Sequence, residues 1–348
     1  MKEFERDFFS NTTTVHNELP ETEALLIHDY IENFYPSIGK VKASFSFGSL
    51  EINSRNIKVV SEVGTFTLKF WESTPRKKVD EIIQVLIFLH SQEMRIPIPI
   101  KNRMGGYLSG PQNKLASLFC YVDGELYSPT QDNLGHFFEA TGQLFSNLGK
   151  ITKSVNLSTT YITSPIETQV SITQSLRNNR LWEDLDSIEL QECLKSMWPL
   201  INKDLDSFRH LSNLSKLQYS HYDLHPKNIL FDSDKGFGFL DFASCTISNP
   251  NIAWGFLLIK NLRQAVVSGG EHGDAKLLAS KAVLDLQKID FAQNLDILNL
   301  PIYGRYEIAK RLAYILDDYT KFGMKTWLSM LPVQIRLLKE SYLLFGEN

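Results

Sequence analysis

The sequence has few of the features that mark a secreted, membrane-spanning or metal-stapled protein. Only three of its 348 residues are cysteines, Cys120, Cys193 and Cys245, and they lie far apart. This number and spacing suggest neither a disulfide framework nor a zinc set, and buried thiols in a reducing compartment are the simpler interpretation. The first 17 residues carry mixed charges without an apolar core, unlike a secretory signal. No uninterrupted apolar run reaches about 18 residues, the length of a membrane span. We therefore expect a cytoplasmic protein.

Charge of one sign is not in excess either. The chain has 36 Lys and Arg against 40 Asp and Glu, which gives a net charge of -4. Such a balance provides no general attraction for nucleic acid or an anionic membrane, so neither is an expected partner. Internal repeats and low-complexity tracts are also missing. The composition is that of an ordinary globular protein, and the length exceeds the roughly 250 to 300 residues at which single cores stop growing. We expect two lobes.

The most informative stretch is residues 220–245, SHYDLHPKNILFDSDKGFGFLDFASC. It predicts a polar loop at 221–228, a short strand at 229–231, a turn and a second strand at 237–240. Such a hairpin brings Asp223, Asn228 and Asp241 to the same end. Their side-chain oxygens suit a hard cation such as Mg²⁺. The sequence therefore predicts a site for phosphate chemistry.

This arrangement resembles the catalytic hairpin of the protein-kinase-like superfamily, most closely the aminoglycoside phosphotransferase and choline kinase family. His221, Asp223 and Asn228 match its His-x-Asp-x-x-x-x-Asn loop, and Asp241 matches the Asp that follows the hairpin. The resemblance implies that Asp223 is catalytic and accepts the proton of the acceptor hydroxyl. It implies that Asn228 and Asp241 hold Mg²⁺ against the phosphates of ATP. Tyr222 departs from the glycine that is common there, which affects the shape of the acceptor pocket.

The first 124 residues predict a small sheet and two helices. Strands are expected at 42–47, 57–63, 66–71 and 115–121, and helices at 21–34 and 76–92. By the resemblance, Lys69 contacts the ATP phosphates and pairs with an acid of the second helix, for which we choose Glu81 over Asp80. The alternative is a Lys69 that points into solvent and helix acids that are merely solvated.

Two further nucleotide contacts are implied by the resemblance. The segment 48–56, which contains a single glycine, corresponds to the turn that covers the phosphates, and Ser49 is its predicted donor; an ordinary hairpin loop is the alternative. The strand that ends near residue 121 corresponds to the hinge that binds adenine. Its predicted contacts are Phe119, Cys120, Tyr121 and Val122.

The remainder of the chain predicts mainly helices. They are expected at 133–148, at 181–211 as one or two helices with Pro199 as the expected point of division, at 253–267, at 274–286 with Asp274 as cap, at 306–322 and at 332–345. Residues 150–164 are expected to form a loop. The resulting fold class is α+β, a two-lobed protein-kinase-like fold. Residues 1–124 form the antiparallel-sheet, nucleotide-binding N-lobe, and residues 125–348 form the mainly helical C-lobe with the catalytic hairpin and the acceptor-binding helices.

The predicted function is an ATP-dependent, magnesium-requiring kinase that moves the γ-phosphate to a hydroxyl of a small molecule. An amino alcohol, a hydroxy amino acid, a sugar or an aminoglycoside are the candidate acceptors. Tyr222, Trp254, Tyr303 and Tyr306 suit a cationic acceptor through cation–π contacts, with core packing as the alternative. Two other functions stay open. One is a metal-dependent hydrolase with His221, Asp223 and His225 as ligands. The other is a nucleotide-binding pseudokinase.

Overall fold

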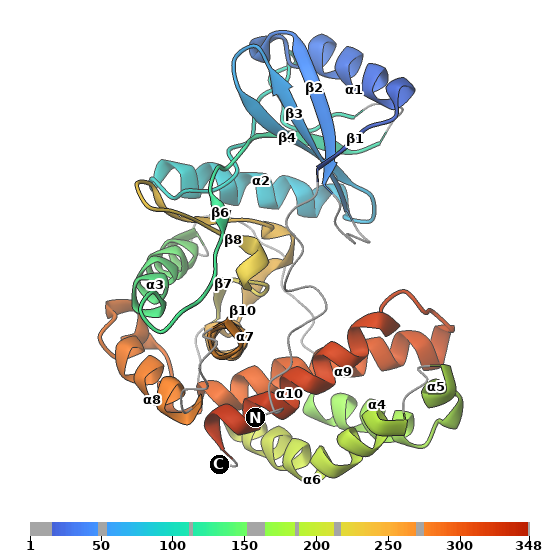
Figure 1. Ribbon diagram of the computed structural model, residues 1–348, viewed down its shortest axis with the longest axis vertical. Helices are drawn as coiled ribbons and strands as arrows, with labels where there is room; N and C mark the ends of the chain where they lie inside the picture. The colour runs from blue at the N-terminus through green and yellow to red at the C-terminus, as the bar shows by residue number, and fades with distance from the viewer. Residues whose placement is uncertain are drawn as a thin grey trace. The chain divides into compact units, whose positions relative to one another are not determined.

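The computed structural model describes residues 16–47, 54–110, 114–151, 164–184, 188–211, 217–268 and 275–346 (Figure 1). Within these ranges the chain forms two compact units. Residues 16–125 and Leu230–Ala243 form one, which we call the sheet unit. Leu126–Ile229 and residues 244–346 form the other, which we call the helical unit. The predicted Ser49 and the predicted helix cap Asp274 lie outside the described residues.

The sheet unit is built on a five-stranded antiparallel sheet with the order β1-β2-β3-β4-β5. The strands are β1 (His16–Glu18), β2 (Val41–Phe47), β3 (Ser54–Ser61), β4 (Thr65–Trp71) and β5 (Ala116–Cys120). Two α-helices, α1 (Glu21–Phe34) and α2 (Arg76–Ser91), complete it, with a 3₁₀ turn at Pro36–Ile38. Helix α1 buries Ile31 against strand residues such as Leu68 and Leu118. The predicted strands and helices of this region are confirmed within a few residues.

A hairpin follows the loop at residues 221–228. Strands β8 (Ile229–Asp232) and β9 (Gly236–Phe239) are neighbours in a three-stranded sheet with β6 (Glu125–Leu126). Arg95, just after α2, fixes β9: its Nη1 donates to the Gly236 carbonyl at 2.5 Å, and its own carbonyl accepts the Phe239 N–H at 2.9 Å. Its Nη2 also donates to the Asp123 carbonyl. One arginine therefore ties the hairpin to the segment that ends β5.

The helical unit contains eight α-helices in its described residues and one strand pair. The helices are α3 (Leu134–Ile151), α4 (Pro165–Leu176), α5 (Asn179–Asp184), α6 (Ile188–Leu211), α7 (Pro250–Ser268), α8 (Ala275–Leu286), α9 (Leu300–Phe322) and α10 (Leu331–Phe345). The strands are β7 (Gln218–His221) and β10 (Cys245–Ser248), which pair antiparallel with His221 opposite Cys245. Helix α9 packs against α4, α6, α7 and α10 and is the centre of the unit (Figure 1). Gly323 ends it, in the left-handed conformation with φ 65°.

Helices α7 and α9 cross at a pair of glycines. A Cβ placed on Gly255 would lie 2.5 Å from the backbone nitrogen of Gly304, closer than real Cβ contacts allow. A Cβ on Gly304 would meet the carbonyl of Gly255 in turn. The two backbones can approach this closely only because neither residue has a side chain. The crossing sets how α9 presents its later residues beside α7.

Some predictions for the helical unit are wrong. Helix α6 runs unbroken through Pro199, because Leu194, Met197, Ile201 and other residues on both sides of it are buried together. Lys150 and Ile151 belong to α3 and not to a loop. The sequence pattern also misses α4, although Ser164 and Glu167 form a capping box at its start. None of the helices in the described residues is long and apolar enough to cross a membrane.

Candidate active site

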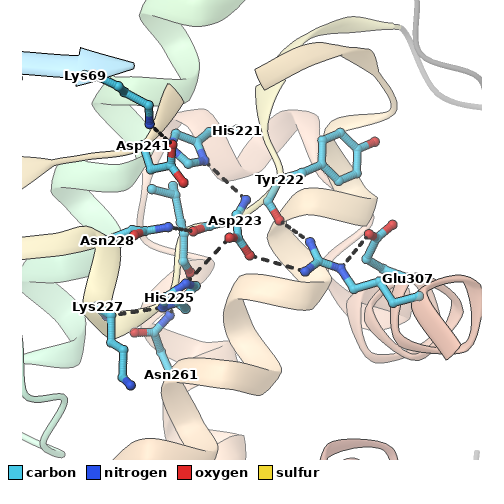
Figure 2. A network of polar contacts seen from close by, with 12 residues as sticks. Lys69, His221, Tyr222, Asp223, His225, Lys227, Asn228, Asp241, Asn261 and Glu307 are labelled. Carbon is cyan, nitrogen blue, oxygen red and sulfur yellow. Dashed lines mark hydrogen bonds and ion pairs between the residues drawn. The ribbon is translucent and has the colours of Figure 1, made fainter. Parts of the chain in front are cut away.

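The loop at residues 221–228 is closed by hydrogen bonds between the residues of the predicted motif. It leaves β7 at His221 and ends in a 3₁₀ turn at Pro226–Asn228. The backbone N–H of Asp223 donates to Nδ1 of His221 at 3.2 Å. The Asn228 amide nitrogen donates to the backbone carbonyl of Asp223 at 2.9 Å (Figure 2). This contact uses the nitrogen of the Asn228 amide and leaves its oxygen for another role.

The Asp223 carboxylate lies between an arginine and a histidine. Its Oδ1 is 3.3 Å from Nη1 of Arg311, and its Oδ2 is 3.6 Å from Nε2 of His225. Burial raises the pKa of Asp223, but the contact with His225 and the positive charges of Arg311 and Lys260 outweigh it and hold that pKa well below its usual value. Asp223 is therefore an ionised carboxylate at neutral pH, with partners on both oxygens.

His225 supports this carboxylate as a neutral ring. Its Nδ1 accepts the backbone N–H of Lys227 at 3.2 Å, so the ring proton sits on Nε2, the atom that faces Asp223 (Figure 2). Burial lowers the pKa of His225, and the positive charge of Lys260 lowers it further. The Nδ1 atoms of His221 and His225 are both engaged by backbone N–H groups, which makes these rings poor candidates for a transition-metal site.

Arg311 is a site residue that the sequence pattern misses. It lies on α9, and its Nε donates to Glu307 at 3.0 Å while its Nη2 donates to the Tyr222 carbonyl at 3.0 Å. Glu307 is almost fully buried and also pairs with Lys310, at 2.5 Å. One sequence signal could have indicated Arg311. The apolar stripe that predicts α9 is interrupted by three charged residues, Glu307, Lys310 and Arg311. Charged residues in such positions are rarely buried without a specific partner.

In the sheet unit, Lys69 and Asp241 form an ion pair. Lys69 is buried on β4, not directed into solvent, and its Nζ is 3.0 Å from Oδ1 of Asp241 (Figure 2). Asp241 has a positive φ of 54°, which is uncommon for a residue with a side chain, although Asp adopts it more readily than most residues. The expected partner of Lys69 needs correction. Among the described residues Lys69 pairs with Asp241, whereas the buried Glu81 pairs with Lys78, its neighbour one helical turn earlier, at 2.5 Å.

The predicted adenine-contact residues lie at the end of β5 and just beyond it. Phe119 is buried and meets the Trp71 ring edge-on. The backbone N–H of Cys120 donates to the Ile98 carbonyl at 2.8 Å. Tyr121 stacks on Phe47, and Val122 follows it outside the strand. Burial raises the pKa of both the Cys120 thiol and the Tyr121 hydroxyl, so both are neutral at physiological pH.

The aromatic residues considered for a cationic acceptor belong to the core. Trp254, Tyr303 and Tyr306 are completely buried, and Tyr306 stacks on Phe208 with 3.6 Å between ring centroids. Tyr222 is almost completely buried and has Nζ of Lys310 at 5.3 Å from its ring centroid. These residues therefore pack in the core, which was the alternative interpretation.

Each of the two predicted metal ligands carries an oxygen donor. Asn228, in the helical unit, has a side-chain amide oxygen, and Asp241, in the sheet unit, has a partly exposed carboxylate; oxygen donors of these kinds suit Mg²⁺ or Ca²⁺. A transition metal does not fit as well. Over the described part of the chain, no group of three or more His, Cys, Asp or Glu side chains could hold a metal ion.

Comparison with known families accounts for this constellation. A sequence model of the phosphotransferase enzyme family matches residues 47–252, more than half of the chain. The chain belongs to this family. The matched segment of this phosphotransferase contains Lys69, Asp223, Asn228 and Asp241, but it ends before Lys260 and Arg311. No curated protein matches the chain by sequence.

Solved structures similar to this phosphotransferase are kinases of small molecules. Spectinomycin phosphotransferase in complex with ADP and spectinomycin has a TM-score of 0.60 at 13% identity, covering 91% of this chain and 94% of its own. Amicoumacin kinase in complex with AMP-PNP, Ca²⁺ and its substrate has a TM-score of 0.59 at 12% identity, covering 93% and 95%. Choline kinase of Streptococcus pneumoniae has a TM-score of 0.56 at 11% identity, covering 92% and 100%. The predicted family resemblance and the α+β, protein-kinase-like fold are confirmed.

Proposed function

We propose that this phosphotransferase is an ATP-dependent kinase that phosphorylates a hydroxyl group of a small molecule. The observation that carries the proposal is the state of Asp223. An ionised carboxylate is fixed within the His221–Asn228 loop by Arg311 and His225, at the motif position whose carboxylate receives the acceptor proton. The family match and the kinases of similar fold support the same reaction class.

In the proposed reaction, the acceptor oxygen bonds to the γ-phosphorus of ATP. The bond between that phosphorus and the bridging oxygen of ADP breaks. The hydroxyl proton moves to a carboxylate oxygen of Asp223 and from there to solvent. Asp223 orients the attacking oxygen, and the neutral His225 and cationic Arg311 keep the carboxylate in place. Most of the rate enhancement then comes from positioning and charge stabilisation.

The nucleotide is assigned to residues of the sheet unit. We propose Lys69 for the phosphates, and Phe119, Cys120, Tyr121 and Val122 for the adenine. Ser49 is retained as a predicted phosphate donor, and Glu81 as a nucleotide-site residue, although Lys69 pairs with Asp241 here. Asn228 and Asp241 would hold Mg²⁺, which neutralises phosphate charge when bound. This division assigns residues 1–124 to nucleotide binding and residues 125–348 to the acceptor and the catalytic loop.

Replacing Asp223 by Asn tests the catalytic assignment. The change keeps the shape of the side chain but removes its ability to accept a proton, so we expect kcat to fall by about 10²- to 10⁴-fold. ADP release is measured with Mg²⁺ and ATP across a panel of small alcohols. Asp206→Asn, at an exposed residue paired with Arg209 on α6, is the matched control and should leave kcat unchanged. Full acceptor-dependent turnover by Asp223→Asn would refute the assignment. Absence of turnover by the parent protein with every acceptor would favour the pseudokinase.

A further inference from the structure

Arg95 starts from a fixed point in the sheet unit. It follows the end of α2, and its neighbours Met94 and Ile96 are both buried. Buried apolar side chains on both sides anchor the backbone at this position. Only 16% of the Arg95 side chain is exposed. A cation that is largely removed from water needs hydrogen-bond partners, so the guanidinium must find them within the protein.

The Arg95 guanidinium contacts two parts of the sheet unit that lie far apart in the sequence. Its Nη1 donates to the carbonyl of Gly236, where β9 begins, at 2.5 Å. Its Nη2 donates to the carbonyl of Asp123, one residue after Val122, and lies 3.9 Å from the carboxylate of Asp232, where β8 ends. A planar guanidinium can bind both carbonyls at once because its donors are fixed in a fork.

The backbone adds closer contacts between the same two parts. The Arg95 carbonyl accepts the N–H of Phe239, two residues before Asp241, at 2.9 Å. A Cβ placed on Gly238 would lie 3.0 Å from Cγ1 of Val122 and 3.5 Å from Cγ of Arg95. The hairpin can lie this close only because position 238 has no side chain. The strand that leads to Asp241 therefore packs directly against Arg95 and Val122.

These contacts join two regions to which the proposed function gives different tasks. Residues 119–122, which we call the adenine segment, are assigned to the base, and Asp241 is assigned to Mg²⁺. A nucleotide that carries its metal has to engage both regions at the same time. Affinity is lost when a protein must first bring its binding groups into place, and it is gained when they are already held there.

We propose that Arg95 is a positioning residue that holds Asp241 in a fixed place relative to the adenine segment, so that ATP and Mg²⁺ bind together. This inference rests on the proposed function and adds a residue that acts through Val122 and Asp241. Loss of Arg95 should weaken ligands that span both regions. It should leave unchanged the binding of a ligand that needs only the adenine segment.

The test compares ligands that span different parts of the site. Isothermal titration calorimetry with the full chain gives the dissociation constants of adenosine, of AMP-PNP with EDTA and of AMP-PNP with Mg²⁺. In Arg95→Met, we expect the gain in AMP-PNP affinity that Mg²⁺ provides to fall by about 10- to 100-fold, the usual cost of losing a group that orients a metal ligand. The affinity for adenosine should not change. Arg95→Lys keeps the charge without the fork and should give an intermediate result.

Lys235→Met is the matched control. It removes the same charge from an exposed ion pair, Lys235 with Asp123 at 3.5 Å, that joins the same two parts of the chain. Exposed pairs contribute little, so all three dissociation constants should stay the same. Circular dichroism and the melting temperature confirm folding, and Arg95→Lys supplies the result if Arg95→Met does not fold. An equal loss for all three ligands, no loss, or the same loss in Lys235→Met would overturn the role of Arg95.

Turnover separates this inference from the proposed function. If the variants behave as expected but the parent protein transfers phosphate to no acceptor, the kinase is refuted and the role of Arg95 is upheld. If the parent protein phosphorylates an acceptor and Arg95→Met keeps the full effect of Mg²⁺, the kinase is upheld and the role of Arg95 is refuted. A parent protein that binds neither adenosine nor AMP-PNP would refute both.

Discussion

The Asp223 carboxylate is shielded from water and yet ionised. These two states usually conflict, because a carboxylate removed from water tends to become neutral. Here Arg311 and His225 contact its two oxygens, and Lys260 adds a further positive charge nearby. The carboxylate stays ionised and points in a fixed direction. The contacts that orient the carboxylate also make it a weaker base, which suits a reaction in which the proton leaves the hydroxyl late.

The lowered pKa of Asp223 has a consequence for stability at acid pH. A carboxyl group whose pKa is lower in the folded than in the unfolded protein stabilises the fold above its unfolded value, here about 3.8, and loses that contribution as the pH falls through the folded value. The free energy of unfolding of the parent protein minus that of Asp223→Asn should therefore be constant above about pH 5 and should decrease below pH 3.8. Urea unfolding between pH 2.5 and 7 measures it. The same difference for Asp206→Asn, at an exposed side chain, should show a much smaller change; equal slopes would contradict the lowered pKa.

The residues of the catalytic loop could be predicted because the motif lies within one short piece of sequence. His221, Asp223 and Asn228 are separated by a few residues, and their contacts follow from the local turn. Arg311 could not be predicted in the same way. It reaches Asp223 from a helix 88 positions later in the chain, and only the packing of α9 brings it there. The choice of Glu81 as the partner of Lys69 failed for a related reason, since Asp241 is 172 positions away.

Helix α6 shows how tertiary packing overrides a local signal. A proline inside a helix removes one hydrogen bond and clashes with the preceding turn, at a cost of about 3 kcal/mol. The helix nevertheless continues through Pro199, because both halves bury apolar residues on one face. The apolar periodicity predicted the helix correctly, and the proline predicted a division that packing prevents.

Replacing Pro199 by Ala should stabilise the protein. The missing hydrogen bond is restored and the clash is removed, so we expect the free energy of unfolding to rise by about 1 to 3 kcal/mol. Denaturation in urea measures it. Pro332→Ala is the matched control: that proline lies in the first turn of α10, where its missing N–H costs nothing, and the change should be close to zero or slightly destabilising. A loss of stability in Pro199→Ala would show that the proline itself is needed for packing.

At the crossing of α7 and α9, by contrast, substitution of a glycine by alanine should destabilise the protein. Gly304→Ala places a methyl group against the backbone of Gly255 and forces the helices apart, so we expect a loss of about 1 to 3 kcal/mol in the free energy of unfolding. Gly135→Ala, in α3, is the control. A Cβ there meets nothing within 4 Å, and the better helix propensity of alanine should stabilise the protein by up to about 1 kcal/mol. If both variants behaved alike, the close approach would not be the cause.

Nucleotide binding by the whole chain can be tested by the rise in melting temperature that a bound ligand causes. A ligand that binds only the folded state raises the melting temperature by mass action. AMP-PNP with Mg²⁺ should therefore raise the melting temperature of the parent protein in proportion to the logarithm of its concentration. Lys69→Met should lose most of this shift because its charge is assigned to the phosphates, whereas Lys288→Met, at an exposed lysine paired with Asp285, should retain all of it. An undiminished shift in Lys69→Met would remove Lys69 from the nucleotide site.

The overall architecture followed from the sequence because each of its signals is local. Strand alternation and helical periodicity placed most elements of both units within a few residues, and the hairpin motif indicated the family. The acceptor could not be predicted, since the matched segment stops at residue 252. The contact of Arg311 with Asp223 becomes visible only when the packing of α9 is known.

The glycine pair at the crossing also limits how this enzyme can be remodelled. Since the α7 and α9 backbones touch at Gly255 and Gly304, neither helix can be shifted to make room for a larger compound without losing that contact. Directed evolution toward new acceptors should therefore recover substitutions elsewhere on the two helices. Random libraries should leave both glycines unchanged, whatever compound is used for selection.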